Sequence, residues 1–297
     1  MKIAFIGGGN MAAALIAGLA GKLTAGADIH VVDPNGAALE KLRAQYGVST
    51  SGALPGARHA PGEPGEGSAA GYQAVASADV IVLAVKPQSM REVAEQLLPL
   101  LPAKADAAAP AGPLLVSIAA GIRAADLSRW LGGYQAIVRC MPNTPALIGM
   151  GVTGMAASAG VSAAQKAAAD AIMKAVGTTV WLDSEDLIDP VTAVSGSGPA
   201  YVFYFIEAMQ RAAVEMGLDA EQGKQLALAT FTGAAQLAAQ SDEPVSLLRE
   251  RVTSKGGTTH AALTSMAADG VADAIVKAMK AAAARGRQLG DELGQAG

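Results

Sequence analysis

The segment IGGGNMAAAL, residues 6–15, decides the fold of the first half of the chain. It places Gly7, Gly9 and Ala12 in a Gly-x-Gly-x-x-Ala pattern, between an apolar, strand-like run and an alanine-rich, helical one. The first glycine of such a pattern permits a tight turn, the second lets the backbone approach a pyrophosphate, and the small third residue lets helix pack on strand. A helix N-terminus also offers amides and a partial positive charge to phosphates. We therefore predict a dinucleotide site rather than an ordinary glycine-rich turn. Its residues are Gly7, Gly8, Gly9, Asn10, Met11 and Ala12.

Strand-like and helical runs alternate beyond this motif. Because strands that alternate with helices indicate βαβ units, the first half predicts a parallel sheet. Nearly continuous apolar strands further indicate a sheet covered on both faces. The expected strands lie at 2–7, 28–33, 78–85, 113–119 and 136–141, and helical runs include 11–23 and 37–47.

The strand-like runs stop near residue 184, and the rest of the chain is helical in composition. We predict an α/β protein with two domains. Residues 1–184 form a Rossmann-like, doubly wound parallel sheet that binds a dinucleotide, and residues 185–297 form an all-helical domain. Two inserts of low complexity, 51–71 and 102–113, are rich in Gly, Pro and Ala and are expected to be mobile loops.

The composition excludes several classes of protein. Hydrophobic residues make up 51% of the 297 positions, and the net charge of −4 is too small to suggest a nucleic-acid or acidic-membrane partner. The one cysteine, Cys140, lies in an apolar run and is expected to be a buried, inert thiol. The three histidines are isolated, so no metal site is predicted. Without a signal peptide or a long apolar run, we expect a cytoplasmic protein.

Asp33 bears on the choice of cofactor. It ends the second expected strand, 21 residues after Ala12, where an acidic residue binds the ribose of a dinucleotide. An ionised carboxylate accepts hydrogen bonds from a free 2′-hydroxyl and repels a 2′-phosphate. Because no arginine or lysine follows at once, the local sequence favours NADH. The alternative is that Asp33 only caps the turn before Pro34.

Later strands end in further candidate residues, because the carboxyl ends of parallel strands line the ligand crevice. Small residues in SIAAGI, 117–122, allow close approach of a nicotinamide, whereas Lys86 either lies beside the cofactor or is simply solvated. Asn143, between two prolines, either presents its amide to the cofactor or closes a loop. The candidate cofactor residues here are Ala84, Val85, Lys86, Pro87, Ala119, Ala120 and Asn143.

A second glycine motif, VTSKGGTTHAAL, occupies residues 252–263. Two glycines inside a helix would cost about 2 kcal/mol relative to alanine. A glycine turn that runs into a helix instead supplies convergent amides for an anion. The residue order Lys-Gly-Gly-Thr-Thr, with no strand before it, excludes a phosphate-binding P-loop. The alternative is a glycine-broken joint between helices, with Thr258 as the N-cap.

Five motifs together resemble one family. IGGGNM, AVKPQ, MPNTPALIGMG, SGSGPAYV and VTSKGGTTHAAL follow one another in the order seen in pyrroline-5-carboxylate reductases, and the resemblance runs from residue 1 to about 290. The resemblance implies reduction of the cyclic imine Δ1-pyrroline-5-carboxylate to proline, the last step of proline biosynthesis, by NADPH or NADH. It also implies an intertwined homodimer through the C-terminal helices, often assembled further into a decamer.

The resemblance also implies roles in the substrate site. Ser254, Gly257 and Thr258 would receive the substrate carboxylate, and Thr259 would hydrogen-bond the ring nitrogen as the catalytic residue. Glu185, in the acidic segment before SGSGPAY, would approach the substrate. Many relatives carry a serine or arginine environment for a 2′-phosphate at the position of Asp33, and the family often prefers NADPH. Both cofactors therefore stay open.

Two other functions remain to be weighed. A β-hydroxyacid dehydrogenase-like enzyme would place a catalytic lysine on the helix after the domain boundary, but residues 198–218 contain no lysine. A dinucleotide-sensing regulator would bind cofactor without needing the loop at 252–259. The aromatic cluster at 201–205 on the same apolar helix is interpreted as a subunit interface rather than part of a substrate pocket.

Overall fold

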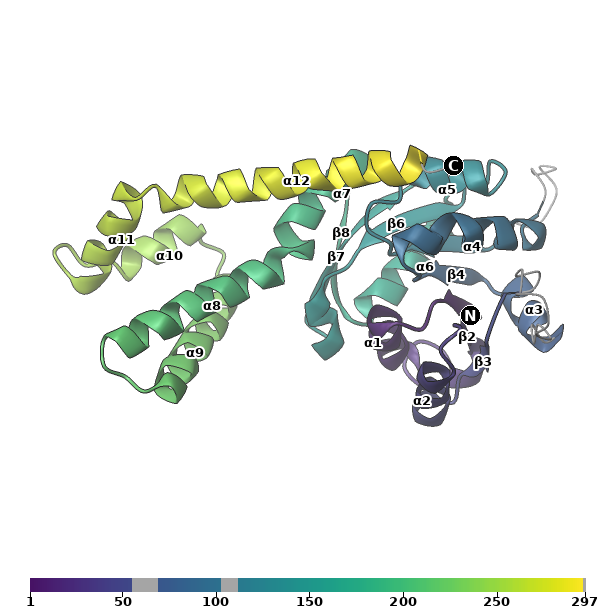
Figure 1. Ribbon diagram of the computed structural model, residues 1–297, viewed down its shortest axis with the longest axis horizontal. Coiled ribbons are helices and arrows are strands. Elements are labelled where there is room, and N and C mark those ends of the chain that lie inside the picture. Colours follow the sequence, from purple (N-terminus) through teal and green to yellow (C-terminus); the bar gives the residue numbers. More distant parts are fainter. Residues whose placement is uncertain (55–68, 103–111, 296–297) are drawn as a thin grey trace. The chain divides into compact units, whose positions relative to one another are not determined.

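The computed structural model describes residues 1–54, 69–102 and 112–295. The chain divides into two units (Figure 1). The sheet unit comprises Met1–Gly196 together with the C-terminal segment from Ala282, and the helical unit comprises Ser197–Ala281. The predicted boundary lies at residue 184, and the return of the C-terminal segment to the first unit was not foreseen.

The sheet unit is built on one eight-stranded sheet with the order β3-β2-β1-β4-β5-β6-β7-β8. Pairing is parallel throughout except between β6 and β7. This arrangement confirms the predicted α/β class and all five predicted strands. The strands are β1 (Ile3–Ile6), β2 (Ile29–Val32), β3 (Ser49–Ser51), β4 (Val80–Leu83), β5 (Leu114–Ser117), β6 (Ile137–Met141), β7 (Gly151–Ala157) and β8 (Gly177–Trp181).

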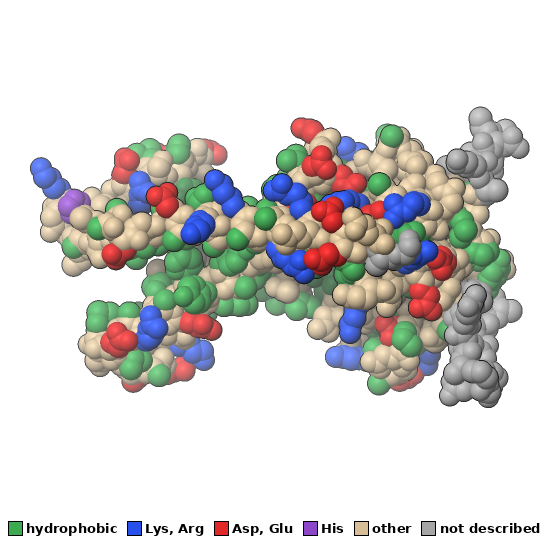
Figure 2. Space-filling model, turned by 45° about the horizontal axis from the view of Figure 1, so that its top comes forward, with side chains coloured by type: hydrophobic (Ala, Val, Ile, Leu, Met, Phe, Trp, Pro, Cys, Tyr) green, Lys and Arg blue, Asp and Glu red, His purple; other side chains and the backbone are tan. Residues whose placement is uncertain are grey.

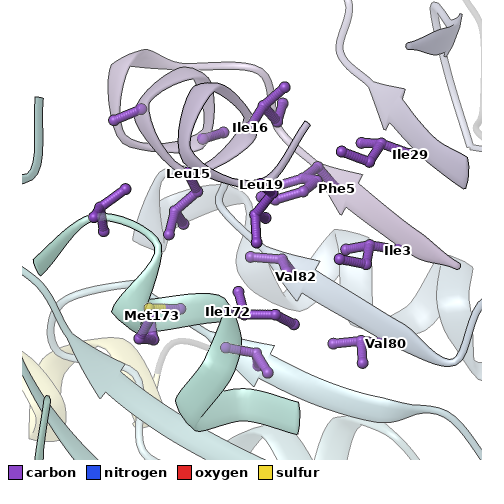
Figure 3. Close-up of a cluster of buried hydrophobic side chains, with 14 of the residues drawn as sticks. Ile3, Phe5, Leu15, Ile16, Leu19, Ile29, Val80, Val82, Ile172 and Met173 are labelled. Carbon is purple, nitrogen blue, oxygen red and sulfur yellow. The ribbon is translucent and has the colours of Figure 1, made fainter. Parts of the chain in front are cut away.

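Helices cover both faces of the sheet, as the apolar strands predict. Alternate residues of a strand point to opposite faces, so Ile3 and Phe5 join one buried cluster while Ala4 and Ile6 join the other. Figure 3 shows the first cluster, in which Phe5 lies beside Leu19 of α1, and Ile172 and Met173 of α6 belong to the same cluster. The helices of this unit are α1 (Asn10–Leu19), α2 (Gly36–Tyr46), α3 (Ala69–Ala76), α4 (Met90–Leu97), α5 (Ala124–Trp130), α6 (Ala163–Lys174) and α7 (Ile188–Val191), which a π-helical turn, Thr192–Gly196, follows.

The two expected mobile loops fall largely outside the described residues, at 55–68 and 103–111. At the edges of the first insert the structure differs from the prediction of a loop. Ser51 ends strand β3, and residues 69–71 begin helix α3. The alanine-rich run that starts at residue 69 has a strong helical propensity, and it outweighs the single Gly71.

The helical unit buries little of its own apolar surface. Its buried positions are few, and helices α10 and α11 have none. On α8, Phe203 is 60% exposed and Tyr204 is 72% exposed. Hydrophobic side chains are accordingly visible on the surface in Figure 2. The helices are α8 (Gly198–Glu215), α9 (Ala220–Ala239), α10 (Val245–Arg251), α11 (Thr258–Ala268) and the first part of α12 (Val271–Gln295).

Candidate functional site

The first glycine turn joins β1 to α1. Gly7 has a φ of +103°, and a Cβ atom there would lie 2.5 Å from the carbonyl oxygen of Ala84. Its amide donates to the carbonyl of Val32 at 2.8 Å. Because β1 lies between β2 and β4, the turn is held between the carboxyl ends of both neighbouring strands. Only glycine satisfies this combination of dihedral angle and close approach.

The N-terminus of α1 presents unpaired amides. Gly9 is the N-cap, with φ −67° and ψ −178°, and no side chain caps the helix. The first amide that finds a helical partner is that of Ala13, which donates to the Gly9 carbonyl at 2.9 Å. Within the described chain, the amides of Asn10, Met11 and Ala12 have no acceptor. A Cβ on Gly9 would meet open space. This geometry fits the pyrophosphate of a dinucleotide.

Asp33 lies beside the same turn with both carboxylate oxygens engaged. Oδ2 accepts from the Gly8 amide at 2.7 Å, and Oδ1 accepts from the Asn35 amide at 2.7 Å. The second bond caps the turn before Pro34, which is the alternative role that the sequence indicated for Asp33. The first bond ties the carboxylate to the glycine turn itself. Since a carboxylate oxygen has two lone pairs, each oxygen keeps one acceptor site for a ribose hydroxyl.

The remaining cofactor candidates lie at the ends of later strands. The Ala84 amide donates to the Ile6 carbonyl at 2.8 Å, which keeps the residue at the end of β4 against the glycine turn. Lys86 is exposed where a short 3₁₀ turn, Pro87–Ser89, begins. Ala119 is buried after β5, and the neighbouring Ala120 is exposed. These positions share the carboxyl edge of β1, β4 and β5, as the parallel pairing requires.

Asn143 closes a loop through both ends of its amide. Nδ2 donates to the carbonyl of Ser195 at 3.2 Å, and Oδ1 accepts from the amide of Val152 at 2.9 Å. Asn143 as a whole is 8% exposed. The loop-closing alternative is therefore present in the structure, and contact with a cofactor through the second Nδ2 hydrogen stays a prediction.

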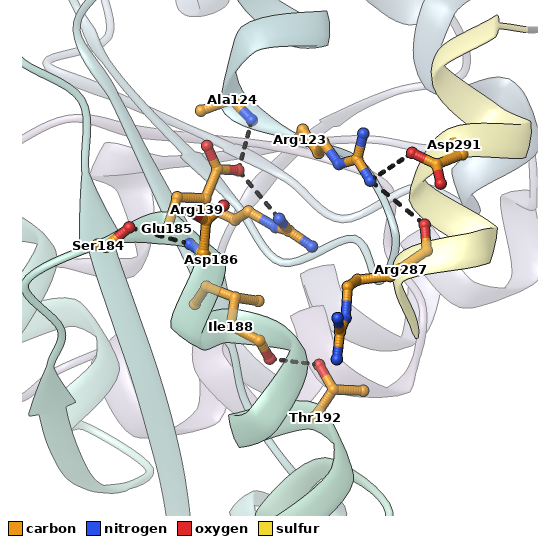
Figure 4. A network of polar contacts seen from close by, with 10 residues as sticks. All are labelled: Arg123, Ala124, Arg139, Ser184, Glu185, Asp186, Ile188, Thr192, Arg287 and Asp291. Carbon is orange, nitrogen blue, oxygen red and sulfur yellow. Dashed lines mark hydrogen bonds and ion pairs between the residues drawn. The ribbon is translucent and has the colours of Figure 1, made fainter. Parts of the chain in front are cut away.

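Glu185 is bonded inside the sheet unit (Figure 4). Its Oε1 accepts both the Ala124 amide at 2.7 Å and Nη1 of Arg139 at 3.0 Å. Arg139 lies on β6 and is 4% exposed. Our reading of the sequence missed this residue. The available signal was a charged residue in the apolar run AIVRCM, since a buried arginine requires an acidic partner.

The second glycine turn joins α10 to α11 in the helical unit. Gly256 has a φ of +73°, and Gly257 is the N-cap of α11 with φ −83° and ψ 177°. No side chain caps this helix, so the alternative of Thr258 as N-cap is wrong: Thr258 is the first helical residue. Among the described residues, no acceptor is present for the amides of Thr258, Thr259 and His260. The Gly257 amide is already used, because it donates to the Ser254 carbonyl at 2.9 Å.

Other chemistries find less support in the described part of the chain. Cys140 is buried, and burial raises the pKa of its thiol, as expected for an inert cysteine. No group of three or more His, Cys, Asp or Glu in the described ranges could hold a metal ion. Across these same ranges, helices long and apolar enough to cross a bilayer are absent.

The chain is similar to proteins of one family over nearly its whole length. Residues 185–289 match the model for pyrroline-5-carboxylate reductase dimerisation, and residues 2–121 match that for NADP oxidoreductase, coenzyme F420-dependent. A curated pyrroline-5-carboxylate reductase of Pseudomonas aeruginosa is 44% identical over 294 residues, which are 99% of this chain and 98% of that protein.

Two solved structures extend the similarity to three dimensions. A pyrroline-5-carboxylate reductase of Coxiella burnetii is 36% identical with a TM-score of 0.84, and the match covers 97% of this chain and 98% of that one. The Plasmodium falciparum enzyme, solved with NADP bound, is 27% identical with a TM-score of 0.79, and the match covers 98% of each chain.

Proposed function

The chain belongs to the pyrroline-5-carboxylate reductase family, and from this premise we propose that its two glycine turns divide the work of the reaction. The protein is an NAD(P)H-dependent oxidoreductase that reduces the cyclic imine L-1-pyrroline-5-carboxylate to L-proline. The turn at residues 7–9 holds the phosphates of the cofactor, and the turn at residues 256–257 holds the substrate carboxylate.

The observation that carries this proposal is the uncapped N-terminus of α11. It presents three unpaired amides directly after a glycine turn, in a unit that contains no strand among its described residues. A carboxylate at a helix N-terminus gains about 0.3–1 kcal/mol when exposed and up to about 2 kcal/mol when partly buried. We assign the carboxylate to the amides of Thr258 and Thr259 and the hydroxyl of Ser254. Gly257 contributes space for this approach, because its own amide is bonded to Ser254.

The reaction mainly requires that the protein align the hydride donor with the imine. NAD(P)H, when bound, supplies the hydride. A protonated imine is a strong electrophile, so aligning the reactants can supply about 7–11 kcal/mol of the barrier reduction. The hydroxyl of Thr259, in the first turn of α11, hydrogen-bonds the ring nitrogen and orients the ring. The same first turn thereby fixes both ends of the substrate.

Asp33 is proposed to favour NADH over NADPH. Its two bonds to the backbone hold the carboxylate at the end of β2, so it cannot turn away from an added 2′-phosphate without losing them. A phosphate placed there would meet a fixed like charge, whereas a 2′-hydroxyl would meet an acceptor.

The protein is a homo-oligomer through its C-terminal region. The exposed Phe203, Tyr204 and Met216 of the helical unit explain why, since isolated monomers rarely expose so much apolar surface. We propose an intertwined homodimer that assembles further into a decamer in the cytoplasm. Light scattering across a dilution series tests this: a monomer mass would refute the dimer, and a stable dimer at high concentration would refute the decamer.

A coupled assay tests the function as a whole. Purified protein is mixed with pyrroline-5-carboxylate and either NADPH or NADH, and both the loss of absorbance at 340 nm and the formation of proline are followed. We expect equal amounts of proline formed and cofactor oxidised. Binding of cofactor without proline formation would instead identify a dinucleotide-sensing protein and overturn the proposal.

A further inference from the structure

Glu185 connects three segments that are distant in the sequence. One of its carboxylate oxygens accepts the amide of Ala124, which begins α5, and the same oxygen accepts Arg139 of β6. Glu185 itself begins the short 3₁₀ turn, Glu185–Leu187, that leads into α7. All three segments belong to the sheet unit, and Figure 4 shows them converging on this carboxylate.

The bond to Ala124 caps the N-terminus of α5, which its own N-cap residue leaves uncapped. The N-cap residue, Arg123, makes no side-chain capping bond. Glu185, 61 residues further along the chain, places its carboxylate at that helix start instead. A carboxylate is favourable at a helix N-terminus because it satisfies an orphan amide and complements the helix dipole. Glu185 therefore holds the first residue of α5 in place.

The start of α5 is the end of the loop that carries Ala119 and Ala120, the proposed neighbours of the nicotinamide. The same loop has further contacts: the Ile118 amide donates to the Leu83 carbonyl at 3.1 Å, and Arg123 donates to the Arg287 carbonyl at 3.3 Å. The ion pair of this loop with α12 is exposed to solvent. Arg123 donates to Asp291 at 2.7 Å, but the two side chains are 39% and 58% exposed. The Arg139 side chain is only 5% exposed and that of Glu185 30%. Water screens the exposed pair, while the buried arginine strongly requires its partner.

We propose that Glu185 is a positioning residue for hydride transfer, which together with Arg139 fixes the loop at 118–123 against the nicotinamide. This inference rests on the proposed cofactor site at the carboxyl edge of the sheet. It departs from the expectation that Glu185 contacts the substrate, since Oε1 of its carboxylate already serves two donors inside the sheet unit. A shift of the loop would spoil the donor–acceptor distance without removing any substrate contact.

Glu185→Gln tests the inference, because the amide keeps an acceptor oxygen and loses the charge that pairs with Arg139. A misplacement of about 1 Å can cost about 100-fold in rate. We expect kcat to fall between about 10- and 100-fold, with the KM for pyrroline-5-carboxylate changed less than about twofold. We also expect a larger primary isotope effect with 4-deuterated NAD(P)H. Asp186→Asn is the matched control, since that exposed neighbour forms no ion pair among the described residues, and it should behave as wild type.

A double variant separates positioning from stability. Arg139→Met combined with Glu185→Gln removes the uncompensated buried charge, so it should recover the melting temperature. The lowered kcat and raised isotope effect should persist, because the cap on α5 still lacks its charge. Wild-type kcat in either folded variant would overturn the inference. So would a raised substrate KM at unchanged kcat, which would mean direct substrate contact. Failure of the proposed function is distinct, since wild type itself would then form no proline.

Discussion

The two glycine turns share two backbone features, although the positive-φ glycine lies two residues before the N-cap in the first turn and one residue before it in the second. Each contains a glycine of positive φ, Gly7 at +103° and Gly256 at +73°. Each ends in an N-cap glycine of extended conformation, Gly9 before α1 and Gly257 before α11, with no side-chain cap. In both turns the first helical amides are unpaired within the described chain. Both turns therefore offer unpaired helix N-terminal amides, which is the geometry that an anion site requires.

The surroundings of the two turns differ. A Cβ on Gly7 would collide with the backbone of Ala84, whereas a Cβ on Gly256 would meet nothing within 4 Å. The sheet unit around Gly7 has two extensive buried clusters. The helices on either side of Gly256, α10 and α11, bury no residue. The first turn is thus packed by its own unit, while the helices that flank the second turn bury no residue among the described ones.

The largest expected effect is that of Gly7→Ala. The new methyl would lie 2.5 Å from the Ala84 oxygen in a left-handed conformation. Overpacking and conformational strain together should destabilise the sheet unit by roughly 3 kcal/mol. Chemical denaturation measures this loss, and cofactor titration should show binding weakened at least about 100-fold. Gly256→Ala is the matched control and should cost about 1 kcal/mol. An equal loss of unfolding free energy in the two variants would show that the turn at Gly7 is no more tightly packed than the turn at Gly256.

Thr259→Ala should lower kcat by about 100-fold, because it removes the hydroxyl that orients the ring nitrogen. The dissociation constant of the cofactor should not change, since the dinucleotide is held at the other turn. Steady-state kinetics measures kcat, and a fluorescence titration with NADH measures the dissociation constant of the cofactor. Thr258→Ala, one residue earlier in the same helical turn, should retain most of the kcat. A wild-type kcat in Thr259→Ala would show that the Thr259 hydroxyl has no role in the reaction.

Asp33→Ser should change the ratio of kcat/KM for NADH to that for NADPH by about 10- to 100-fold in favour of NADPH. Serine removes the fixed negative charge and retains a hydroxyl for a phosphate oxygen. The change should appear in the KM of each cofactor rather than in kcat, because the ribose lies away from the transferred hydride. A ratio that Asp33→Ser leaves unaltered would show that the carboxylate only stabilises the glycine turn.

Asn10→Pro offers a smaller and more local test of the cofactor turn. Asn10 is the first residue of α1, where proline is tolerated, and the extended Gly9 suits a following proline. The substitution removes one amide that should bind phosphate. Since a hydrogen bond to a charged group contributes about 1.5–3 kcal/mol, cofactor affinity should fall about 10-fold relative to Asn10→Ala. The KM for pyrroline-5-carboxylate should stay the same, and a change there would contradict the division of labour.

The sheet could be predicted where its strands are apolar, and not elsewhere. The five predicted strands are buried runs, such as IAFI in β1. Strand β3, Ser49–Ser51, is short and polar, and its reading as a strand depends on pairing with β2. Strand β8 is half-exposed, and β7 is rich in glycine and alanine. These three carry little hydrophobic signal, so only their partners in the sheet reveal them.

In the same way, the features of the site that form continuous motifs could be recognised in the sequence, whereas its long-range contacts could not. Both glycine turns are visible as motifs because each is a continuous stretch with its own backbone requirement. The partners of Glu185 and Asn143 are not visible in this way. Glu185 reaches Arg139 across 46 residues, and Asn143 reaches Ser195 across 52. No local pattern encodes such pairings, which exist only once the sheet has formed.

Removal of a single amide from the turn at residues 256–257 is the sharpest test of whether helix α11 binds the substrate carboxylate. Thr258 is the first residue of α11 and follows the extended Gly257, so Thr258→Pro deletes its amide with little cost to the helix. Thr258→Ala, which keeps the amide, is the control. The measurement is kcat/KM for pyrroline-5-carboxylate and for 1-pyrroline, the same cyclic imine without its carboxylate. We expect about a 10-fold loss relative to the control for the carboxylated substrate only. Equal losses with both imines, or no loss with either, would contradict it.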